Sequence, residues 1–328
     1  MSPNTVVDIP DLADIHLARA RIDDWTRLTP VLNDPGLDQE LGCILYCKCE
    51  NLQRTGAFKF RGASNAISRL REDGIEGDVA THSSGNHGAA LALAAKLDQR
   101  KAHVVMPDNS VPMKIESVRR YGGIVHFCAP TQESREEELA KLVEDGKIPI
   151  PPYDHADIIA GQGTAALELI QEVPTLEQII TPVGGGGLIS GTAIAVRDTG
   201  LQVYGVEPEG AADTVASLER DERVMSWTPD TIADGLRAII GVRNFTIIRN
   251  QVKQVFTVSD EDIRRAMYLF WQELRLVIEP SSATVIAAIR NHRDVFAGKK
   301  VGAIISGGNI DPGAWQSMTN ISAGGGRF

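Results

Sequence analysis

The stretch Asn51-Leu-Gln-Arg-Thr-Gly-Ala-Phe-Lys-Phe-Arg-Gly62 places Lys59 between Phe58 and Phe60, directly after a turn that contains Gly56. Two large apolar neighbours predict that the Lys59 ammonium is partly removed from water, which lowers its pKa. A lysine with a lowered pKa is a nucleophile that can form an imine with a carbonyl carbon. The alternative is a lysine whose stem packs on the rings while its head reaches water.

A second stretch, Thr81-His-Ser-Ser-Gly-Asn-His-Gly88, lies just before the helix-like run 89–97. Free backbone N–H groups and the helix dipole make the start of a helix suited to an anion, such as a substrate carboxylate. The alternative is an ordinary helix cap, because serine and asparagine cap helices without any ligand.

A third stretch, Ile179-Ile-Thr-Pro-Val-Gly-Gly-Gly-Gly-Leu-Ile-Ser-Gly191, runs from an apolar strand through four glycines into a helix. Consecutive glycines let the backbone wrap closely around an anion, and phosphate is the natural ligand. Gly186 to Gly191 has Walker A spacing, but Thr192 stands where that motif needs lysine, and no Gly-x-Gly-x-x-Gly fits. The run therefore predicts a phosphate site of another kind and counts against a nucleotide-binding oxidoreductase.

These three stretches, followed in order by Ser306-Gly-Gly-Asn309, closely resemble the motifs of the fold type II pyridoxal-phosphate (PLP) enzymes. Within that fold the chain is similar to the serine racemase and serine/threonine dehydratase branch, which includes the hydroxyaspartate dehydratases. The resemblance runs from about residue 29 to 311. His87 stands where enzymes of the cysteine synthase type usually have threonine, which favours the dehydratase side.

Strand-like and helix-like runs alternate along the chain, which predicts an α/β fold of parallel sheets with right-handed crossovers. Strands are expected at 43–50, 78–82, 101–106, 123–128, around Ile179, 203–206 and 301–305. Helices are expected at 11–25, 62–70, 89–97, 113–121, 134–144, 163–171, 188–196, 259–274 and 281–291. The resemblance implies a tryptophan synthase β-like arrangement, with two parallel-sheet α/β domains and PLP in the cleft between them. Residues 1–77 and 155–328 would form the large PLP-binding domain, and residues 78–154 a small mobile domain.

The resemblance also implies a role for each residue around the cofactor. Lys59 would bind PLP as an imine and act as a base on one face of the ring, Phe58 would pack against the ring, and Asn86 would hydrogen-bond the ring hydroxyl. The phosphate would be held by the backbone N–H groups of Gly184, Gly185, Gly186, Gly187 and Leu188. Ser306 would face the pyridine nitrogen, where a hydroxyl favours elimination or racemisation over transamination.

Four residues are implied in substrate binding. Ser83, Ser84 and His87 would bind the substrate carboxylate, and Ser84 would also be the acid/base on the face opposite Lys59. Arg135 would lie near the substrate side chain, where its guanidinium could bind a second carboxylate, as in 3-hydroxyaspartate. From the residues alone, Arg135 could instead pair with glutamates on a helix surface. Ala238 stands where serine racemases have a serine, which weakens a pure serine racemase assignment.

The loop Glu207-Pro-Glu-Gly-Ala-Ala-Asp213 resembles the divalent-cation site of this branch. Glu207 and Asp213 would supply carboxylates and Ala211 a backbone carbonyl, an oxygen-only set that suits Mg²⁺, or Ca²⁺ or Mn²⁺. Without the resemblance, two acids in a loop would simply be solvated.

Composition limits the class of protein. The 328 residues are 43% hydrophobic and 23% charged, which is ordinary for a soluble enzyme. A net charge of −10 without a basic cluster counts against nucleic acid or an anionic membrane as partner. No stretch approaches the ~20 apolar residues of a membrane span, and residues 1–8 lack the apolar core of a signal peptide. We therefore expect a cytoplasmic protein. Together with the family resemblance, we expect a homodimer whose partner is a small amino-acid substrate.

The predicted function is a PLP-dependent dehydratase (ammonia-lyase). It would convert L-serine, L-threonine or 3-hydroxyaspartate into a 2-oxo acid or imino acid by α,β-elimination. The alternative within the class is an amino-acid racemase that uses Lys59 and Ser84 on opposite faces. A binding protein that kept the PLP pocket without turnover is an alternative of another class, and the presence of all the reactive residues counts against it.

Overall fold

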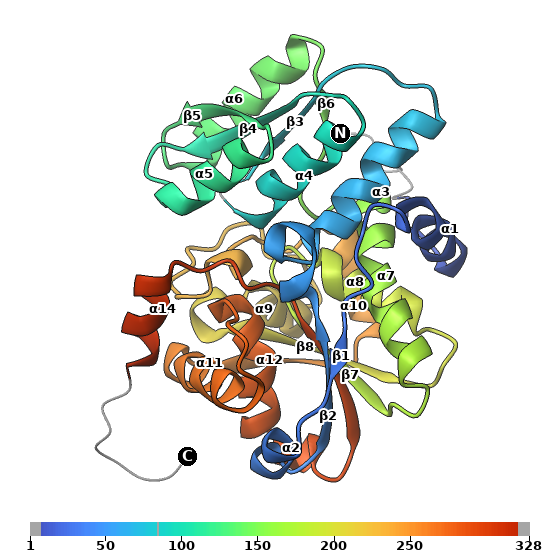
Figure 1. The fold of residues 1–328 in the computed structure, drawn as a ribbon, viewed down its shortest axis with the longest axis vertical. Coiled ribbons are helices and arrows are strands. Elements are labelled where there is room, and N and C mark those ends of the chain that lie inside the picture. Colours follow the sequence, from blue (N-terminus) through green and yellow to red (C-terminus); the bar gives the residue numbers. More distant parts are fainter. Residues whose placement is uncertain (1–7, 84, 321–328) are drawn as a thin grey trace.

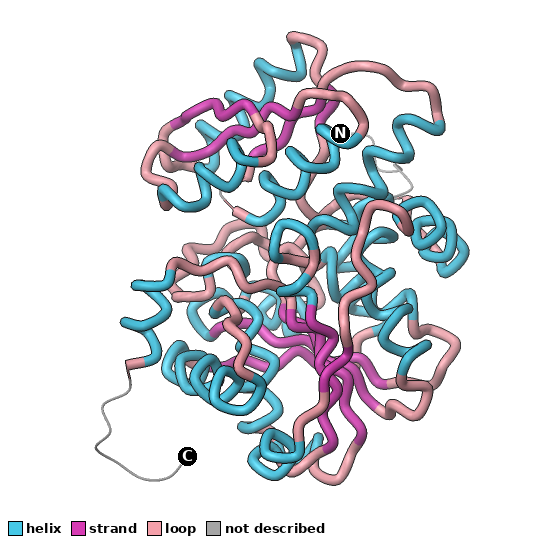
Figure 2. The backbone as a smooth tube through the Cα atoms, in the orientation of Figure 1, coloured by secondary structure: helices cyan, strands magenta, loops and turns pink. Residues whose placement is uncertain are grey.

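The computed structural model describes residues 8–83 and 85–320. Ser84 therefore lies outside the described residues, as do residues 1–7, which make up nearly all of the segment compared with a signal peptide. The chain forms a six-stranded and a four-stranded β-sheet, each flanked by helices (Figures 1 and 2). The predicted α/β class with two predominantly parallel sheets is confirmed. None of the described helices is long and apolar enough to cross a membrane.

The six-stranded sheet forms the centre of the larger part of the molecule. In spatial order its strands are β1 (Val31–Leu32), β2 (Ile44–Cys49), β10 (Lys300–Ile305), β7 (Gln178–Pro182), β8 (Gln202–Pro208) and β9 (Gln254–Val258). Every neighbouring pair is parallel except β1 with β2. Because helices cover both faces, β7 is buried along its whole length.

Two groups of helices cover the two faces of this sheet (Figure 1). One core is formed with α1 (Leu12–Ile22), α7 (Ala156–Glu172), α8 (Gly187–Ala195) and α10 (Val242–Gln251). The opposite core is formed with α2 (Pro35–Leu41), α11 (Asp260–Leu274), α12 (Pro280–Asn291) and α13 (Arg293–Phe296). Two further helices are α9 (Asp213–Arg220), which contacts β9, and α14 (Pro312–Thr319), which contacts α11.

The four-stranded sheet lies in the smaller part of the molecule (Figure 1). Its order is β5 (Ile124–Cys128), β4 (Ala102–Pro107), β3 (Val79–His82) and β6 (Ile148–Pro149), and all pairs are parallel. Helices α4 (Asn86–Leu97) and α5 (Pro112–Arg120) share a core on one face, and α6 (Gln132–Glu144) covers the other. All four strands fall between residues 78 and 154, while the division into domains stays a prediction.

Helix α3 (Lys59–Glu72) connects the two parts of the molecule. Its residues Phe60, Ala63 and Ile67 belong to the core under the small sheet, and it also packs against α7 of the large part. The helix was expected from Gly62 but begins at Lys59. Lys59 therefore lies in the first turn of a helix that is packed on both sides, which gives its side chain a rigid base.

The cysteines of β2 behave as buried thiols. Cys47 and Cys49 are both fully buried, and all four cysteines of the chain are free. Burial raises the pKa of Cys49 to about 12, so this thiol stays protonated and unreactive at neutral pH.

Candidate active site

Lys59 is half-buried and is held by one backbone contact. Its Nζ donates a hydrogen bond to the Pro152 carbonyl at 2.9 Å and lies 5.0 Å from the centroid of the Phe58 ring. Burial lowers the pKa of Lys59 to about 8, and the nearby Glu279 carboxylate opposes that shift. Lys59 is therefore much closer to the neutral amine at physiological pH than an exposed lysine, as an imine-forming residue requires.

The four glycines form the buried turn between β7 and α8. Gly186 has a φ of +91°, a conformation that favours glycine. A Cβ on Gly185 would lie 2.3 Å from a ring carbon of Tyr153, so this position also has no room for a side chain. Helix α8 begins at Gly187, and the first N–H groups of a helix have no partner within it. The turn has the properties that a phosphate cradle needs.

Two segments predicted to contact the cofactor are joined to each other. The Phe58 N–H donates to the Ser306 carbonyl at 2.9 Å, which ties the turn before Lys59 to the end of β10. Ser306 is buried, and its hydroxyl oxygen lies 3.0 Å from that of Ser282. The sequence motifs at residues 58–59 and 306 therefore meet at the carboxyl end of β10.

Asn86 links the small part of the molecule to the large part. Its Nδ2 donates to the Glu279 carboxylate at 2.8 Å, and its Oδ1 accepts from the Asn309 side chain at 2.9 Å. Burial, together with repulsion from Asp234, raises the pKa of Glu279 to about 7. Asn86 is held in one orientation by two partners from distant parts of the chain, which suits the predicted ring contact.

Ser83 and His87 flank the start of α4, and Ser84 lies outside the described residues. The Ser83 hydroxyl oxygen accepts from the Gly88 N–H at 3.1 Å. His87 is buried, and its Nε2 lies 3.1 Å from the Ile150 carbonyl oxygen. A carbonyl oxygen only accepts, so Nε2 is assigned the proton.

The state of His87 bears on its predicted role. Burial, together with the charge of Lys59, lowers the pKa of His87 to about 3, so the ring is neutral. Nδ1 has no hydrogen-bond partner among the described residues. With the proton on Nε2, Nδ1 can accept a hydrogen bond but cannot donate one to a carboxylate. In this arrangement His87 fits a structural contact to Ile150 better than the predicted contact to a substrate carboxylate.

Arg135 lies in the first turn of α6, close to the end of β3. Its side chain is half-buried, and its Nε is buried without a hydrogen-bond partner among the described residues. Burial, and next the charge of Arg135, lower the pKa of His82, the last residue of β3. The guanidinium therefore lies near the strand end that leads to Ser83. Within the described chain it forms none of the glutamate pairs that a helix-surface role would give.

The predicted cation loop connects β8 to α9, and its three predicted ligands Glu207, Ala211 and Asp213 are all buried. The Glu207 carboxylate accepts hydrogen bonds from the Thr214 and Val215 N–H groups at 3.1 and 3.0 Å. These bonds hold the acid at the start of α9.

The two predicted carboxylate ligands of this loop have raised pKa values. Burial, with repulsion from Asp213, raises the pKa of Glu207 to about 8, and burial raises that of Asp213 to about 6. Among the described residues no group of three or more His, Cys, Asp or Glu side chains could hold a metal. A cation here would therefore depend on two carboxylates and the Ala211 carbonyl, a set that fits a hard ion such as Mg²⁺.

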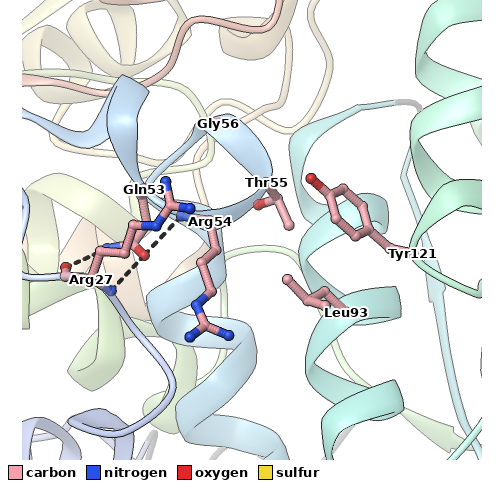
Figure 3. Close-up of a pocket in the computed structure, with 7 residues that line it drawn as sticks. All are labelled: Arg27, Gln53, Arg54, Thr55, Gly56, Leu93 and Tyr121. Atoms are coloured by element: carbon pink, nitrogen blue, oxygen red, sulfur yellow. Dashed lines mark hydrogen bonds between the residues drawn. The ribbon is translucent and has the colours of Figure 1, made fainter.

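A cavity of about 390 Å³ lies beside the turn before Lys59 (Figure 3). It is lined by Arg27, Gln53, Arg54, Thr55, Gly56, Leu93 and Tyr121. Two of the lining residues are joined, because the Gln53 side chain accepts a hydrogen bond from the Arg27 N–H at 2.9 Å and donates one to the Arg27 carbonyl at 2.8 Å. None of the predicted cofactor or substrate residues lines this cavity, so it is distinct from the candidate active site.

The residues present fit PLP. A buried glycine turn at a helix start suits the phosphate, Lys59 has the lowered pKa that binding the aldehyde carbon requires, and Ser306 supplies a buried hydroxyl for the ring nitrogen. When bound, PLP withdraws electrons from the α-carbon of an amino acid.

Three residues of the site were not predicted from the sequence. Tyr153 packs on Gly185, Asn244 bonds the Gly185 carbonyl at 2.7 Å, and Glu279 bonds Asn86. The run Pro151-Pro-Tyr-Asp154 could have marked Tyr153, since two prolines before an aromatic residue predict an ordered turn. Glu279 and Asn244 act through contacts with residues far away in the sequence.

Comparisons with known proteins show the family to which the chain belongs. Residues 22–307 match the family described as "Pyridoxal-phosphate dependent enzyme". The chain is 43% identical to the serine racemase of Dictyostelium discoideum, over 98% of this chain and 100% of that protein. It is 42% identical to a β-hydroxyaspartate dehydratase of Paracoccus denitrificans, over 92% and 97%. The solved structure of maize serine racemase superposes with a TM-score of 0.90 at 40% identity, covering 95% of this chain and 97% of that one.

The fold and the site thus define an α/β enzyme that binds PLP. The chain belongs to the fold type II family of PLP-dependent enzymes, and its relatives are lyases and racemases of amino acids. The family resemblance and the fold class predicted from the sequence are both confirmed.

Proposed function

We propose that this protein is a PLP-dependent dehydratase (ammonia-lyase) that acts on a small β-hydroxy amino acid, with 3-hydroxyaspartate favoured over serine and threonine. The α-proton and the β-hydroxyl leave as water, and the enamine that remains becomes an imine, which water hydrolyses to a 2-oxo acid and ammonia. The similarity to a protein named β-hydroxyaspartate dehydratase supports this reaction class.

The Nε of Arg135 carries the choice of substrate. This nitrogen is buried without a partner among the described residues, and a buried unpaired donor of a charged group costs free energy. A second carboxylate on the substrate would supply the missing acceptor in bidentate geometry. Serine and threonine have no such group, so they would leave this Nε unpaired.

The chain's own residues supply a base and an anion site. Lys59, with a pKa of about 8, can accept the α-proton and hold it as the ammonium. The Ser83 hydroxyl and the N-terminal turn of α4 are suited to the α-carboxylate of the substrate. Gly184–Gly187 and Leu188 would hold the phosphate of PLP, and Phe58, Asn86 and Ser306 would contact its ring.

Racemisation is the second candidate, favoured by the 43% identity to a serine racemase. Inversion at the α-carbon needs a proton donor on the face opposite Lys59, and Ser84 is the candidate for it. Elimination needs only one face, so the two activities can coexist in one site.

We further propose that Glu207, Asp213 and the Ala211 carbonyl bind Mg²⁺ or a similar hard cation. The burial of all three groups in one short loop supports this, because a divalent ion would relieve the repulsion between the two carboxylates.

The deciding experiment measures release of 2-oxo acid with PLP and Mg²⁺ present. The panel contains L- and D-serine, L-threonine, and the threo and erythro isomers of 3-hydroxyaspartate, with chiral analysis of the remaining substrate. We expect fastest release from one hydroxyaspartate isomer. Inverted serine with little 2-oxo acid would make the racemase correct instead, and no turnover of any member of the panel would refute both.

A further inference from the structure

The peptide between Gly185 and Gly186 is held from outside the glycine turn. The Gly185 carbonyl accepts two hydrogen bonds from the region where α10 starts, from the Asn244 side chain at 2.7 Å and from the Gly241 N–H at 3.2 Å. Both donors lie more than fifty residues along the chain from the turn that they hold. Neither bond belongs to a helix or to the sheet, so the contact is specific to this turn.

Fixing that carbonyl also fixes the direction of the next N–H. A trans peptide is planar, with its carbonyl and N–H pointing in opposite directions. Because the Gly185 carbonyl points at Asn244 and Gly241, the Gly186 N–H points away from α10. Gly186 has a φ of +91°, and a turn of several glycines has many alternative peptide orientations of similar energy. Without an external donor, little would select this orientation.

The surroundings of Asn244 favour its role as the donor to the Gly185 carbonyl. It is fully buried, and its Nδ2 lies near two carbonyl oxygens, of Gly185 at 2.7 Å and of Tyr153 at 3.4 Å. Turning the amide over would place its oxygen against both carbonyl oxygens, so these partners set the amide orientation. A Cβ on Gly186 would lie 2.7 Å from the Asn244 Cβ, which shows how closely the helix and the turn approach.

The helix that carries Asn244 is itself anchored near Lys59. The Asp154 carboxylate accepts hydrogen bonds from the Val242 and Arg243 N–H groups at 2.9 and 3.2 Å, which caps the start of α10. Asp154 lies two residues after Pro152, whose carbonyl binds the Lys59 Nζ. The position of Asn244 is therefore set by the same loop that contacts the candidate imine-forming lysine.

We propose that Asn244 is a positioning residue for the cofactor phosphate: its amide holds the Gly185–Gly186 peptide so that the Gly186 N–H points to the phosphate oxygens. This inference rests on the proposed role of the glycine turn as the phosphate site. It does not depend on which amino acid is turned over. The expected effect is on the phosphate group alone, because Asn244 contacts the turn and none of the residues predicted to bind the ring.

The test compares PLP with pyridoxal, which lacks the phosphate. Apo-protein is titrated with each compound, and dissociation constants are measured by absorbance for the wild type, Asn244→Ala and the control Asn250→Ala. Asn250 is an exposed residue of the same helix, so its substitution leaves the turn untouched. Loss of one hydrogen bond predicts a Kd for PLP that rises about 3- to 10-fold in Asn244→Ala. The Kd for pyridoxal should stay within about twofold, because the ring contacts remain.

Each outcome decides the inference. Equal weakening of PLP and pyridoxal would make Asn244 a general packing residue, and unchanged PLP binding would remove it from the site; both overturn the proposal. If Asn244→Ala does not fold, Asn244→Ser is judged by the same ratio of constants, since its hydroxyl ends one bond short of the amide nitrogen. A wild type that prefers PLP over pyridoxal but shows no lyase turnover would refute the proposed reaction and leave this inference intact. A wild type without that preference would refute the phosphate site itself.

Discussion

At the scale of single residues, the site depends on groups whose charge state is set by burial. Lys59 and His87 are both pushed toward their neutral forms, while burial favours the protonated form of Glu279. These three shifts reduce the charge that Lys59, His87 and Glu279 carry near neutral pH. A substrate carboxylate could therefore bind Arg135 and the helix N–H groups with less competition from the Glu279 carboxylate.

Lys59 predicts a pH dependence. Only the neutral amine attacks an aldehyde, so the rate at which apo-protein forms an adduct with pyridoxal should rise as the pH increases through about 8 and level off above it. Trapping the adduct with borohydride measures this rate. Lys59→Ala should abolish the specific adduct, and the exposed control Lys101→Ala should retain it. A rate that keeps rising toward the pKa of an ordinary lysine would show that Lys59 is not desolvated.

Arg135 predicts a change in substrate preference. Arg135→Ala should lower kcat/KM for 3-hydroxyaspartate by about 10- to 100-fold, the effect of losing a charge-assisted bidentate contact of ~1.5–3 kcal/mol. Threonine should change less than about threefold, because it has no carboxylate for Arg135 to bind. The exposed control Arg119→Ala, on helix α5 at the other face of the small sheet, should change neither. Equal losses on both substrates would remove Arg135 from side-chain recognition.

At the scale of elements, helix α3 is fixed by a buried ionic network just after Lys59. Arg61 lies between Glu50 and Glu168, with N–O distances of 2.7 Å to each, and Lys48 also pairs with Glu168 at 2.7 Å. All four side chains are buried. The network joins β2, the turn after it, α3 and α7, so it holds the base of Lys59 against the large sheet.

This network predicts a large effect on stability. Arg61→Met would remove the cation that pairs with Glu50 and would leave Glu168 with Lys48 and the half-exposed Arg19. It should lower the free energy of unfolding by about 3–5 kcal/mol in urea titrations. Arg69→Met is the matched control on the same helix, since its pair with Asp73 is exposed and should contribute less than about 1 kcal/mol. Similar small losses in both variants would contradict a structural role for the network.

At the scale of the whole molecule, the two parts meet through polar contacts across the candidate site. Lys114 of α5 pairs with Asp234 of the large part, and Asn86 bonds both Glu279 and Asn309. The proposed cation loop lies in the large part of the molecule, where it connects β8 to α9. Any ion there would stabilise the folded chain as a whole.

The cation loop predicts a stability that depends on divalent ions. Mg²⁺ at about a hundredfold excess over its Kd should add ~2.7 kcal/mol and raise the Tm by several degrees, relative to chelator. Glu207→Gln should abolish the increase, whereas Glu209→Gln, an exposed acid two residues away, should keep it. An identical rise in all three proteins would place the ion elsewhere.

Local patterns explain why much of the fold could be predicted. Continuous apolar runs marked β4, β7 and β10. The helix expected at 259–274 is α11, and the Ser259 hydroxyl caps it by accepting from the Asp262 N–H. Short or irregular elements such as β1, β6, α2 and α10 were missed. Two-residue strands have no detectable periodicity, and tertiary packing decides whether they form.

The sequence by itself determined the chemistry that the site can offer. A lysine between phenylalanines, a run of four glycines and a serine-asparagine helix start each carry a local physical signal, and their order pointed to PLP. Only the tertiary structure decided which residues support them. Glu279 reaches Asn86 across 193 positions, Asn244 reaches Gly185 across 59, and Arg61 is paired with Glu168 across 107. No local pattern marks such contacts, because they arise when distant segments pack together, and burial then sets the charges of Lys59, His87 and Glu279.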